Sequence, residues 1–432
     1  MAFPEGFLLG AATAAHQVEG NNIHSDCWVM EQVRHSDFAE PSGKAVDHYH
    51  RYEEDIRLLA QAGLNAYRFG IEWARIEPQE GRFDKAEVDH YRAVLACCKK
   101  YHVTPVVTLH HFSSPAWLIG KGGWAKPYVV RAFARYAAYV AEQLGEELPW
   151  VCTINEANMG GQLNKIVADM MSARKKKGAV QVGTAEGLNL KRLLLGMFEQ
   201  GKAFHCSPFA INNFLKPRKP DQEAIVMQAH SEAVQAFKKV APQTKLGLTL
   251  SLFDYQPTPA GKQTAVRLWQ EDFGFYLPYI QNDDFLGVQN YSRKIVDGTG
   301  AREPAVDAPV TQMGYEDYPA SIGHVVRKVA AQFKGDLLVT ENGISTDNDV
   351  RRCDFIREAV AGVQQCAADG IPIKGYFYWS LLDNFEWQAG YAKTFGLIAV
   401  DRTTQKRIPK HSLQVLGDLA QKGYADEPHG ME

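Results

Sequence analysis

The sequence predicts an α/β protein folded as a single (β/α)8 barrel, the TIM-barrel class. Three observations predict it: short apolar segments alternate with segments of helical period, the alternation occurs eight times, and no Pro/Ser-rich linker interrupts it. Such alternation favours a closed parallel barrel over an open doubly wound sheet. The length of 432 residues also allows two or three domains, but the unbroken alternation indicates one domain over residues 1–432.

Eight segments are predicted as strands because each is short, apolar and rich in β-forming residues. They are Phe7–Thr13, Asn65–Phe69, Thr104–Leu109, Trp150–Ile154, Leu246–Leu250, Phe285–Gln289, Leu337–Thr340 and Lys374–Trp379. Between them, apolar residues recur three, four and seven positions apart. One such series is Val130, Phe133, Ala137, Val140 and Leu144. This spacing predicts helices that pack by one face.

One connection breaks the alternation. A long loop over residues 157–221 is predicted between the fourth strand and a helix around Gln222–Val240. Connections in compact domains usually span about 2–6 residues, so a long one is expected to carry a site or a lid. Its basic run, Arg174–Lys177, is expected to be a solvated surface rather than an anion site.

Composition and charge exclude several classes. The formal net charge of −3 weakens any case for a nucleic-acid partner. No apolar run approaches the ~18 residues of a membrane helix. The segment Phe7–Ala15 looks like a short signal sequence, but Glu5 precedes it and no basic segment does. Seven cysteines without a CxxC pair argue against a disulfide framework and a zinc site, and favour a reducing cytoplasm.

Polar residues gather where the predicted strands end, which is where barrel enzymes place their chemistry. Glu156 and Glu341 directly follow the fourth and seventh strands. Barrel closure can bring these strand ends face to face, and glycoside hydrolysis needs such a pair of carboxyls. From the fold alone, a catalytic pair and two rim ion pairs remain equally open. No phosphate-binding GxxxxGK[ST] and no strand followed by GxGxxG occurs.

The motifs at these strand ends resemble those of glycoside hydrolase family 1, the β-glucosidase family. The two signatures are Thr-Ile-Asn155-Glu156 and Val-Thr-Glu341-Asn342-Gly343. Further matching segments begin at Phe7, Asp47, Tyr67, Thr108 and Trp379. The likeness therefore covers nearly the whole chain, and the motifs occur in order at the predicted strand ends.

The resemblance implies a retaining mechanism with Glu341 as nucleophile and Glu156 as general acid, then base. It implies that Arg68 and Tyr291 hold and orient the nucleophile, and that Asn155 donates to the sugar 2-hydroxyl. The other implied sugar-binding residues are Gln17, His110, Glu386 and Trp387, with Trp379 as the platform beneath the sugar. His111 is left as structural, since the family pattern is read as placing the sugar ligand one residue earlier.

Each assignment has an ordinary structural alternative. Taken alone, Gln17 is more typical of a strand cap and His110 of a core histidine. Three departures from the family pattern affect the leaving-group side more than the reaction type. Ala157 stands where proline commonly follows the acid/base glutamate, Gln289-Asn290-Tyr291 replaces a common Asn-Tyr-Tyr, and His16 replaces a frequent aromatic.

The predicted function is an exo-acting retaining β-glucosidase, with β-galactosides and β-fucosides as further candidate substrates. The expected partner is a small-molecule β-glycoside or oligosaccharide, with no metal or organic cofactor. A transglycosidase remains an alternative because the same two glutamates serve both outcomes. A 6-phospho-β-glucosidase is disfavoured because Glu386 stands where that branch shows serine. A non-catalytic sugar-binding barrel would have no reason to retain both carboxylates. The sequence predicts no oligomeric state.

Overall fold

A closed parallel barrel forms the centre of the protein, for which a computed structural model describes residues 3–171 and 190–422. Its strand order is β1-β11-β10-β7-β5-β4-β3-β2, so the first and last strands are neighbours. The barrel strands are β1 Leu8–Ala12, β2 Ala66–Gly70, β3 Thr104–His110, β4 Trp150–Ile154, β5 Lys245–Ser251, β7 Phe285–Gln289, β10 Asp336–Asn342 and β11 Ile373–Trp379. The predicted fold class is confirmed, and each predicted strand overlaps an observed one.

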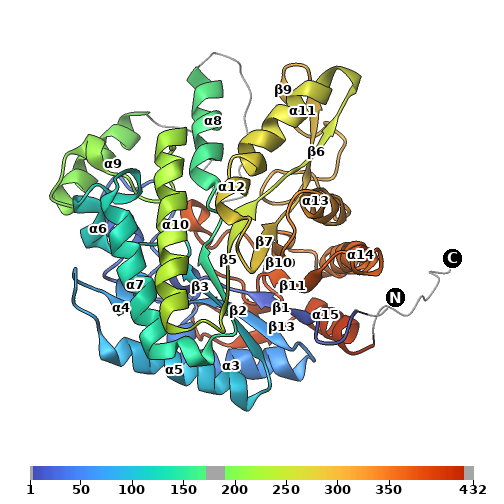
Figure 1. Cartoon of the computed structure of the whole chain (residues 1–432), viewed down its shortest axis with the longest axis horizontal. Coiled ribbons are helices and arrows are strands. Elements are labelled where there is room, and N and C mark those ends of the chain that lie inside the picture. The colour runs from blue at the N-terminus through green and yellow to red at the C-terminus, as the bar shows by residue number, and fades with distance from the viewer. Residues whose placement is uncertain (1–2, 172–189, 423–432) are drawn as a thin grey trace.

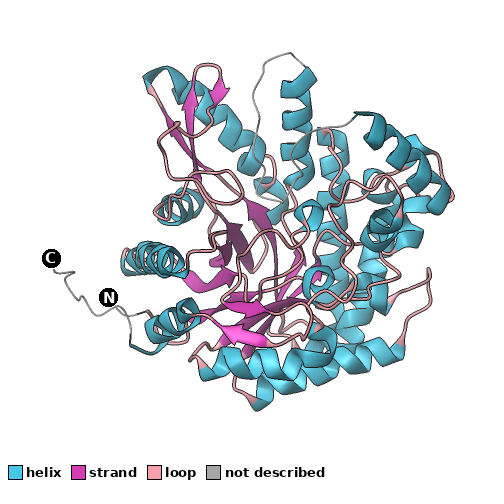
Figure 2. Cartoon of the chain, turned by 180° about the vertical axis from the view of Figure 1, so that it is seen from behind, coloured by secondary structure: helices cyan, strands magenta, loops and turns pink. Residues whose placement is uncertain are grey.

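Helices surround the strands, as Figures 1 and 2 show from opposite sides. They are α1 Ala15–Val18, α2 Asp26–Gln32, α3 His48–Gln61, α4 Trp73–Ile76, α5 Lys85–Lys100, α6 Ala116–Gly120, α7 Tyr128–Leu144, α8 Met159–Met171, α9 Leu190–Ala203, α10 Pro220–Val240, α11 Lys262–Trp269, α12 Leu277–Ile280, α13 Ser321–Ala330, α14 Asp349–Ala368 and α15 His411–Lys422. In α7, the predicted apolar series is buried. The period of 3.6 residues therefore marks the face that packs on the barrel.

The interior of the barrel is closed at one end by apolar side chains. Seven of the strands contribute to one buried cluster, and six of its residues stand within the first three positions of their strands: Leu8, Ala66, Val106, Cys152, Phe285 and Leu338. Ala12 of β1 and Phe377 and Trp379 of β11 join the cluster from positions further along their strands. The N-terminal end of the barrel is thus filled, and polar side chains are left to gather at the C-terminal end.

In its described part, the long connection after β4 contains the α-helices α8 and α9. Helix α8 follows β4 closely, α9 comes later, and the helix predicted around Gln222–Val240 is α10. The basic run Arg174–Lys177 lies outside the described residues. Figure 1 shows α8 at the same end of the barrel as α11 and a small three-stranded sheet. That sheet consists of β6 Asp254–Pro257, β8 Arg293–Asp297 and β9 Gly300–Ala301.

The remaining strands, β12 Ile398–Val400 and β13 Arg407–Pro409, form an antiparallel pair. All seven cysteines are free thiols. Within residues 3–171 and 190–422, no helix combines the length and apolar character needed to cross a membrane.

Candidate active site

The carboxyl of Glu341 lies in β10 at the C-terminal end of the barrel and is held by three donors. Arg68 Nη1 donates to its Oε1 over 2.6 Å, and the Tyr291 hydroxyl donates to its Oε2 over 2.6 Å. Gln289 Nε2 donates to Oε1 over 3.0 Å. All four side chains are buried. A carboxylate fixed through both oxygens has one orientation, which an attacking group requires.

Glu156 follows β4 in an unusual backbone conformation. Its φ angle is +44°, in the left-handed region that non-glycine residues rarely adopt. Three hydrogen bonds hold this turn against β5: Glu156 N–H donates to Thr249 Oγ1 over 2.8 Å, Ala157 N–H donates to the Thr249 carbonyl over 3.0 Å, and Asn158 Nδ2 donates to the Ser251 carbonyl over 2.7 Å. The strained turn directs the Glu156 side chain into the site rather than along the strand.

The departure at Ala157 takes part in this turn. A proline at this position would lack the N–H that bonds to Thr249. Proline also disfavours several backbone conformations of the residue before it, here Glu156. The alanine therefore gives the turn at Glu156 a hydrogen bond that the more common residue cannot make.

The two carboxyls differ in proton affinity. Burial, and then the charge of Glu341, raise the pKa of Glu156 well above its ordinary value. Burial also raises the pKa of Glu341, but Arg68, Tyr291 and Gln289 act against that rise. When one proton is shared by the pair, it therefore resides on Glu156. A protonated carboxyl and an ionised one in the same pocket supply an acid and a nucleophile together.

Gln17, near the first strand of the barrel, contacts Glu386, which follows the last strand. Gln17 Nε2 lies 3.2 Å from Glu386 Oε2 and 2.8 Å from the Phe385 carbonyl. Burial and the charge of Glu341 raise the pKa of Glu386 to about 8. Gln17 Oε1 and Glu156 Oε2 are buried without a hydrogen-bond partner among the described residues. Buried polar atoms are normally paired, so these two are available to a polar ligand.

Indole and imidazole rings form one wall of the site. His111 stacks on Trp379 with ring centroids 5.6 Å apart and an interplanar angle of 26°. His16 stacks on Trp387 at 5.7 Å and 7°, and its Nε2 lies 2.6 Å from Glu31 Oε1. The imidazole of His16 thus keeps an aromatic ring where the family frequently has one. Flat rings of this kind can receive the apolar face of a sugar.

The structure corrects the assignment of His110. Its Nε2 contacts Ser114 Oγ at 2.9 Å, and its ring packs on Trp124 and Phe214. His111, for which the sequence predicts a structural role, lies among the site residues instead. Its Nε2 is 3.1 Å from Asn155 Nδ2. Neighbouring residues on an extended strand point to opposite sides, so a shift of one position moves the side chain out of the site.

The imidazole of His111 is neutral, and its tautomer follows from its contact. Burial, followed by the charge of Arg68, holds the pKa of His111 well below its ordinary value. Since Asn155 Nδ2 can only donate, His111 Nε2 accepts, and the ring proton is on Nδ1. That Nδ1 is buried with no partner among the described residues. The site therefore holds an unused donor beside Asn155.

Sequence reasoning did not identify Thr249 or Gln289 as functional. Gln289 appeared there only as a departure from the family pattern, although it touches the carboxylate of Glu341. Thr249 lies within β5 and carries no charge, so no motif marks it. The position of Gln289 at the C-terminal end of β7 could have identified it, because Asn155 occupies the corresponding position just after β4.

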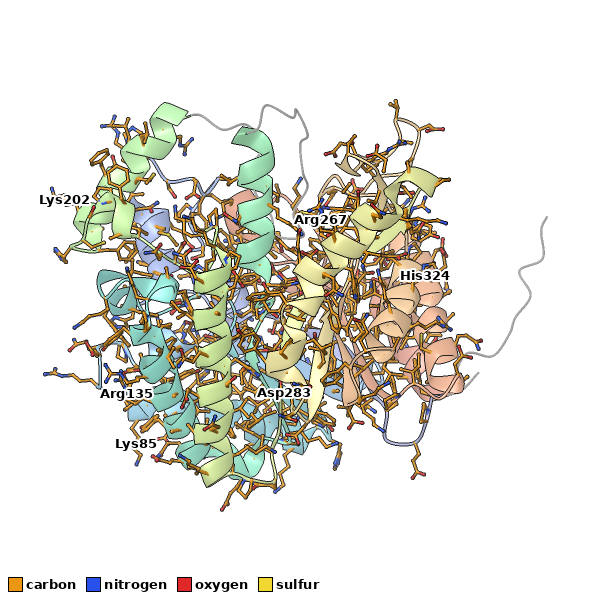
Figure 3. The ribbon with its side chains drawn as sticks, turned by 45° about the horizontal axis from the view of Figure 1, so that its top comes forward. Lys85, Arg135, Lys202, Arg267, Asp283 and His324 are labelled. Carbon is orange, nitrogen blue, oxygen red and sulfur yellow. The ribbon has the colours of Figure 1, made fainter. Side chains whose placement is uncertain are left out.

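A separate cavity of about 620 Å³ is present, and its lining includes neither Glu156 nor Glu341 nor the residues that donate to Glu341. Its lining includes Gln162 of α8, Tyr255 of β6, Arg267 of α11 and Tyr315; Arg267 is labelled in Figure 3. Tyr315 connects the two regions, because its ring centroid lies 6.2 Å from that of Tyr291. The cavity is large enough for a group attached to a bound sugar.

The class of protein follows from these features. Among the described residues, no cluster of three or more His, Cys, Asp or Glu side chains could hold a metal ion. A barrel with a proton-bearing carboxyl and an ionised carboxyl in one buried pocket has the arrangement of a glycoside hydrolase.

Comparison with known proteins agrees with this class. The model of glycosyl hydrolase family 1 matches residues 1–180 and 281–424. Beta-glucosidase A of Thermotoga maritima is 30% identical over 468 aligned residues, covering 95% of this chain and 96% of that protein. A 6-phospho-beta-galactosidase of Streptococcus equi subsp. zooepidemicus is 29% identical, covering 96% and 97%. The crystal structure of beta-glycosidase BGL167 superposes with a TM-score of 0.87 at 39% identity, covering 99% of this chain and all of that one (100%). The chain belongs to glycosyl hydrolase family 1.

Proposed function

We propose that this chain is a retaining β-glucosidase that removes terminal β-D-glucosyl residues from small glycosides or oligosaccharides. One observation carries the proposal: Arg68 and Tyr291 each donate to the Glu341 carboxyl over 2.6 Å, whereas Glu156 Oε2 is buried without a partner among the described residues, so a proton shared by the pair is favoured on Glu156. A retaining glycosidase needs this asymmetry before the first chemical step. The proposal treats the whole chain as one catalytic domain working in a reducing cytoplasm.

In the first step, a Glu341 oxygen attacks the anomeric carbon and forms an ester, while Glu156 gives its proton to the departing glycosidic oxygen. This step removes the charge of Glu341, and with it one cause of the raised pKa of Glu156. Glu156 is then the base that takes a proton from water in the second step. The same carboxyl thus serves as acid and base, because its pKa follows the state of its neighbour.

The sugar itself would be held by the ring wall and the unpaired polar atoms. We assign hydroxyl contacts to Gln17, His111, Glu386 and Trp387, with Trp379 beneath the sugar face and Asn155 at the 2-hydroxyl. The support is that Gln17 Oε1 and His111 Nδ1 are buried and unpaired among the described residues. The attached group would occupy the cavity bounded by Tyr315.

A 6-phosphoglycosidase is the second candidate, since one relative carries the name 6-phospho-beta-galactosidase at 29% identity. Electrostatics at Glu386 weigh against it. The charge of Glu341 already raises the pKa of Glu386. The same negative potential would disfavour a phosphate dianion at this position.

One substrate panel tests the proposal and its rivals. It contains aryl β-glycosides of glucose, galactose, fucose, xylose and 6-phosphoglucose, together with cellobiose. We expect the highest kcat/KM on the glucoside and a far lower value on the 6-phosphoglucoside; the reverse order would overturn the glucosidase assignment. Product analysis at high alcohol concentration separates hydrolysis from transglycosylation. A glycosyl adduct located on Glu341 by peptide mass spectrometry would support the nucleophile assignment, and an adduct elsewhere would refute it.

A further inference from the structure

Gln289 ends β7 and is completely buried in the middle of the site. Its Nε2 lies 3.0 Å from Glu341 Oε1, 2.7 Å from Asn155 Oδ1 and 3.0 Å from Thr249 Oγ1. Three oxygen atoms therefore face one amide nitrogen. Its bond to Glu341 was described above, but its contacts with Asn155 and Thr249 have no role yet.

The surroundings of Gln289 determine which way its amide points. The oxygens of Glu341 and Asn155 can only accept, so an amide turned the other way would place its own oxygen against two acceptors. Thr249 Oγ1 already accepts from Glu156 N–H over 2.8 Å and donates to Asn155 Oδ1 over 3.1 Å. Thr249 Oγ1 can accept a second bond, so it is a third acceptor for the amide, but the contact of Gln289 Nε2 with Asn155 is the shortest of the three at 2.7 Å.

Arg68 makes the same two contacts as Gln289. Its Nη1 donates to Glu341 Oε1 and its Nη2 donates to Asn155 Oδ1, both over 2.6 Å. The nucleophile oxygen and the amide oxygen of Asn155 are thus bridged twice, by a charged fork and by a neutral amide. A second cation in place of Gln289 would lower the pKa of Glu156 and so reduce the fraction of Glu156 that carries a proton, whereas a neutral donor stabilises Glu341 without that cost.

We propose that Gln289 is a positioning residue that couples Glu341 to Asn155. By occupying Asn155 Oδ1 together with Arg68, it fixes the amide so that only Nδ2 remains for a ligand. By donating to Glu341 Oε1, it helps to keep that carboxyl ionised. Gln289 therefore controls two things: the orientation of the Glu341 carboxylate, and the N–H group that Asn155 presents to a ligand. This inference rests on the proposed roles of Glu341 and Asn155.

The length of the side chain matters to this role. An asparagine at position 289 would be one methylene shorter, which withdraws its amide by about 1.5 Å. From there one nitrogen would not reach both Glu341 and Asn155 at hydrogen-bond distance. Substitution by Asn therefore removes the bridge while keeping an amide in the site, and Met removes the donor while keeping the length.

The test compares Gln289→Met and Gln289→Asn with the wild type. The matched control is Gln364→Met, which removes another buried amide, from α14. The kcat/KM is measured across pH with an aryl β-glucoside and with its 2-deoxy analogue. We expect both Gln289 variants to lose about 10- to 100-fold on the glucoside, the order seen when a buried donor to a reacting anion is removed. The control should retain the wild-type profile.

Two readouts separate positioning from simple packing. Loss of the donor raises the pKa of Glu341, so the acidic limb of the profile should move to higher pH. The loss should also be smaller on the 2-deoxy substrate, which cannot use Asn155. An unmoved acidic limb with equal losses on both substrates would overturn the proposal, as would near-wild-type activity. Failure of the proposed function looks different, because the wild type itself would then cleave no β-glycoside.

Discussion

Two buried arginine–carboxylate pairs, Arg407–Asp55 and Arg68–Glu341, shift the pKa of the carboxyl in opposite directions. Between α3 and β13, Arg407 holds Asp55 with both arms of its fork, over 2.7 and 2.8 Å, and His48 Nδ1 lies 2.8 Å from the same carboxylate. In the active site, Arg68 gives one arm to Glu341 and the other to Asn155. All of these groups are buried.

The split fork changes the ionisation of the carboxyl. Burial alone would raise the pKa of Asp55, but the hydrogen bonds from Arg407 and His48 outweigh it, and the pKa is lowered. At Glu341, burial outweighs Arg68, Tyr291 and Gln289, and the pKa is raised. A buried carboxylate whose hydrogen bonds outweigh the cost of burial stabilises the folded state. A buried carboxylate whose hydrogen bonds only partly offset that cost keeps a perturbed pKa, as is typical of functional sites.

The two pairs should also respond to pH in opposite directions. The pKa of Asp55 is lower folded than unfolded, so its stabilising effect is present above the unfolded pKa and is lost as pH falls through the folded one. The pKa of Glu341 is higher folded than unfolded, so its ionisation costs stability as pH rises through the same region. The first pair therefore supports the folded state at neutral pH, and the second opposes it.

Breaking the active-site pair by Glu341→Gln should have the largest effect. With no nucleophile, kcat should fall on the order of 10⁴- to 10⁶-fold, as when the central member of a catalytic group is removed. Thermal unfolding should occur at the same or a higher temperature, because a buried charge is gone. Glu358→Gln on the exposed face of α14 serves as the control. Activity within tenfold of the wild type would contradict the assignment of Glu341.

The second prediction concerns the protonated partner. Glu156→Ala should reduce kcat/KM by about 10²- to 10⁴-fold on glycosides with poor leaving groups. On aryl glycosides with acidic leaving groups, the first step should be much less affected, because such groups depart without a proton. The basic limb of the pH profile, which the raised pKa of Glu156 places above the ordinary carboxyl range, should disappear. Equal losses on both substrate types would argue against the acid role.

The structural pair is broken by Asp55→Asn, which leaves Arg407 buried and incompletely paired. The free energy of unfolding at neutral pH should fall by about 3–5 kcal/mol, measured by denaturant titration. The difference from the wild type should shrink as pH falls, while kcat per folded molecule stays unchanged. Asp354→Asn, a half-exposed carboxylate on α14, should cost far less. A large drop in kcat with no loss of stability would contradict a purely structural role for the Arg407–Asp55 pair.

The smallest expected effect distinguishes the two adjacent histidines. His111→Ala should lower kcat/KM by about 10- to 100-fold through loss of a buried hydrogen-bond donor. His110→Ala should act mainly on stability, because it leaves a hole beside Trp124 and Phe214. Steady-state kinetics and thermal unfolding of both variants provide the check. If His110→Ala lost activity and His111→Ala lost only stability, the sugar contact would have to be assigned to His110.

The eight strands were predictable because each is a short apolar segment bounded by helical patterns. The place of both glutamates at strand ends marked them as candidates, but only the family resemblance favoured a catalytic pair over two rim ion pairs. The helices of the long connection were missed although their sequence carries the helical pattern: in α9, Leu190, Leu193, Leu194, Met197 and Phe198 recur three or four positions apart. Leu194 and Phe198 are nevertheless 43% and 57% exposed, so this pattern does not mark a face that packs on the barrel.

Within the site, sequence reasoning failed where a choice of one position or one hydrogen bond decides the role. His110 and His111 differ only in which side of the strand they face. Gln289 and Thr249 act through contacts between strands that no sequence motif expresses. Local pattern thus indicates which elements form the site, and tertiary contacts decide which side chain of each element is used.

The pairing of β1 with β11 sets the order in which this pocket is assembled during synthesis. Gln17 and Glu386, which bond to each other, are 369 positions apart. While the ribosome makes the intervening chain, β1 has one open edge, a surface prone to pairing with other strands. Arg68 and Glu156 emerge long before Glu341. The pocket can therefore be completed only near the end of translation, when Glu341 and Glu386 have been added to a chain that already contains Arg68 and Glu156.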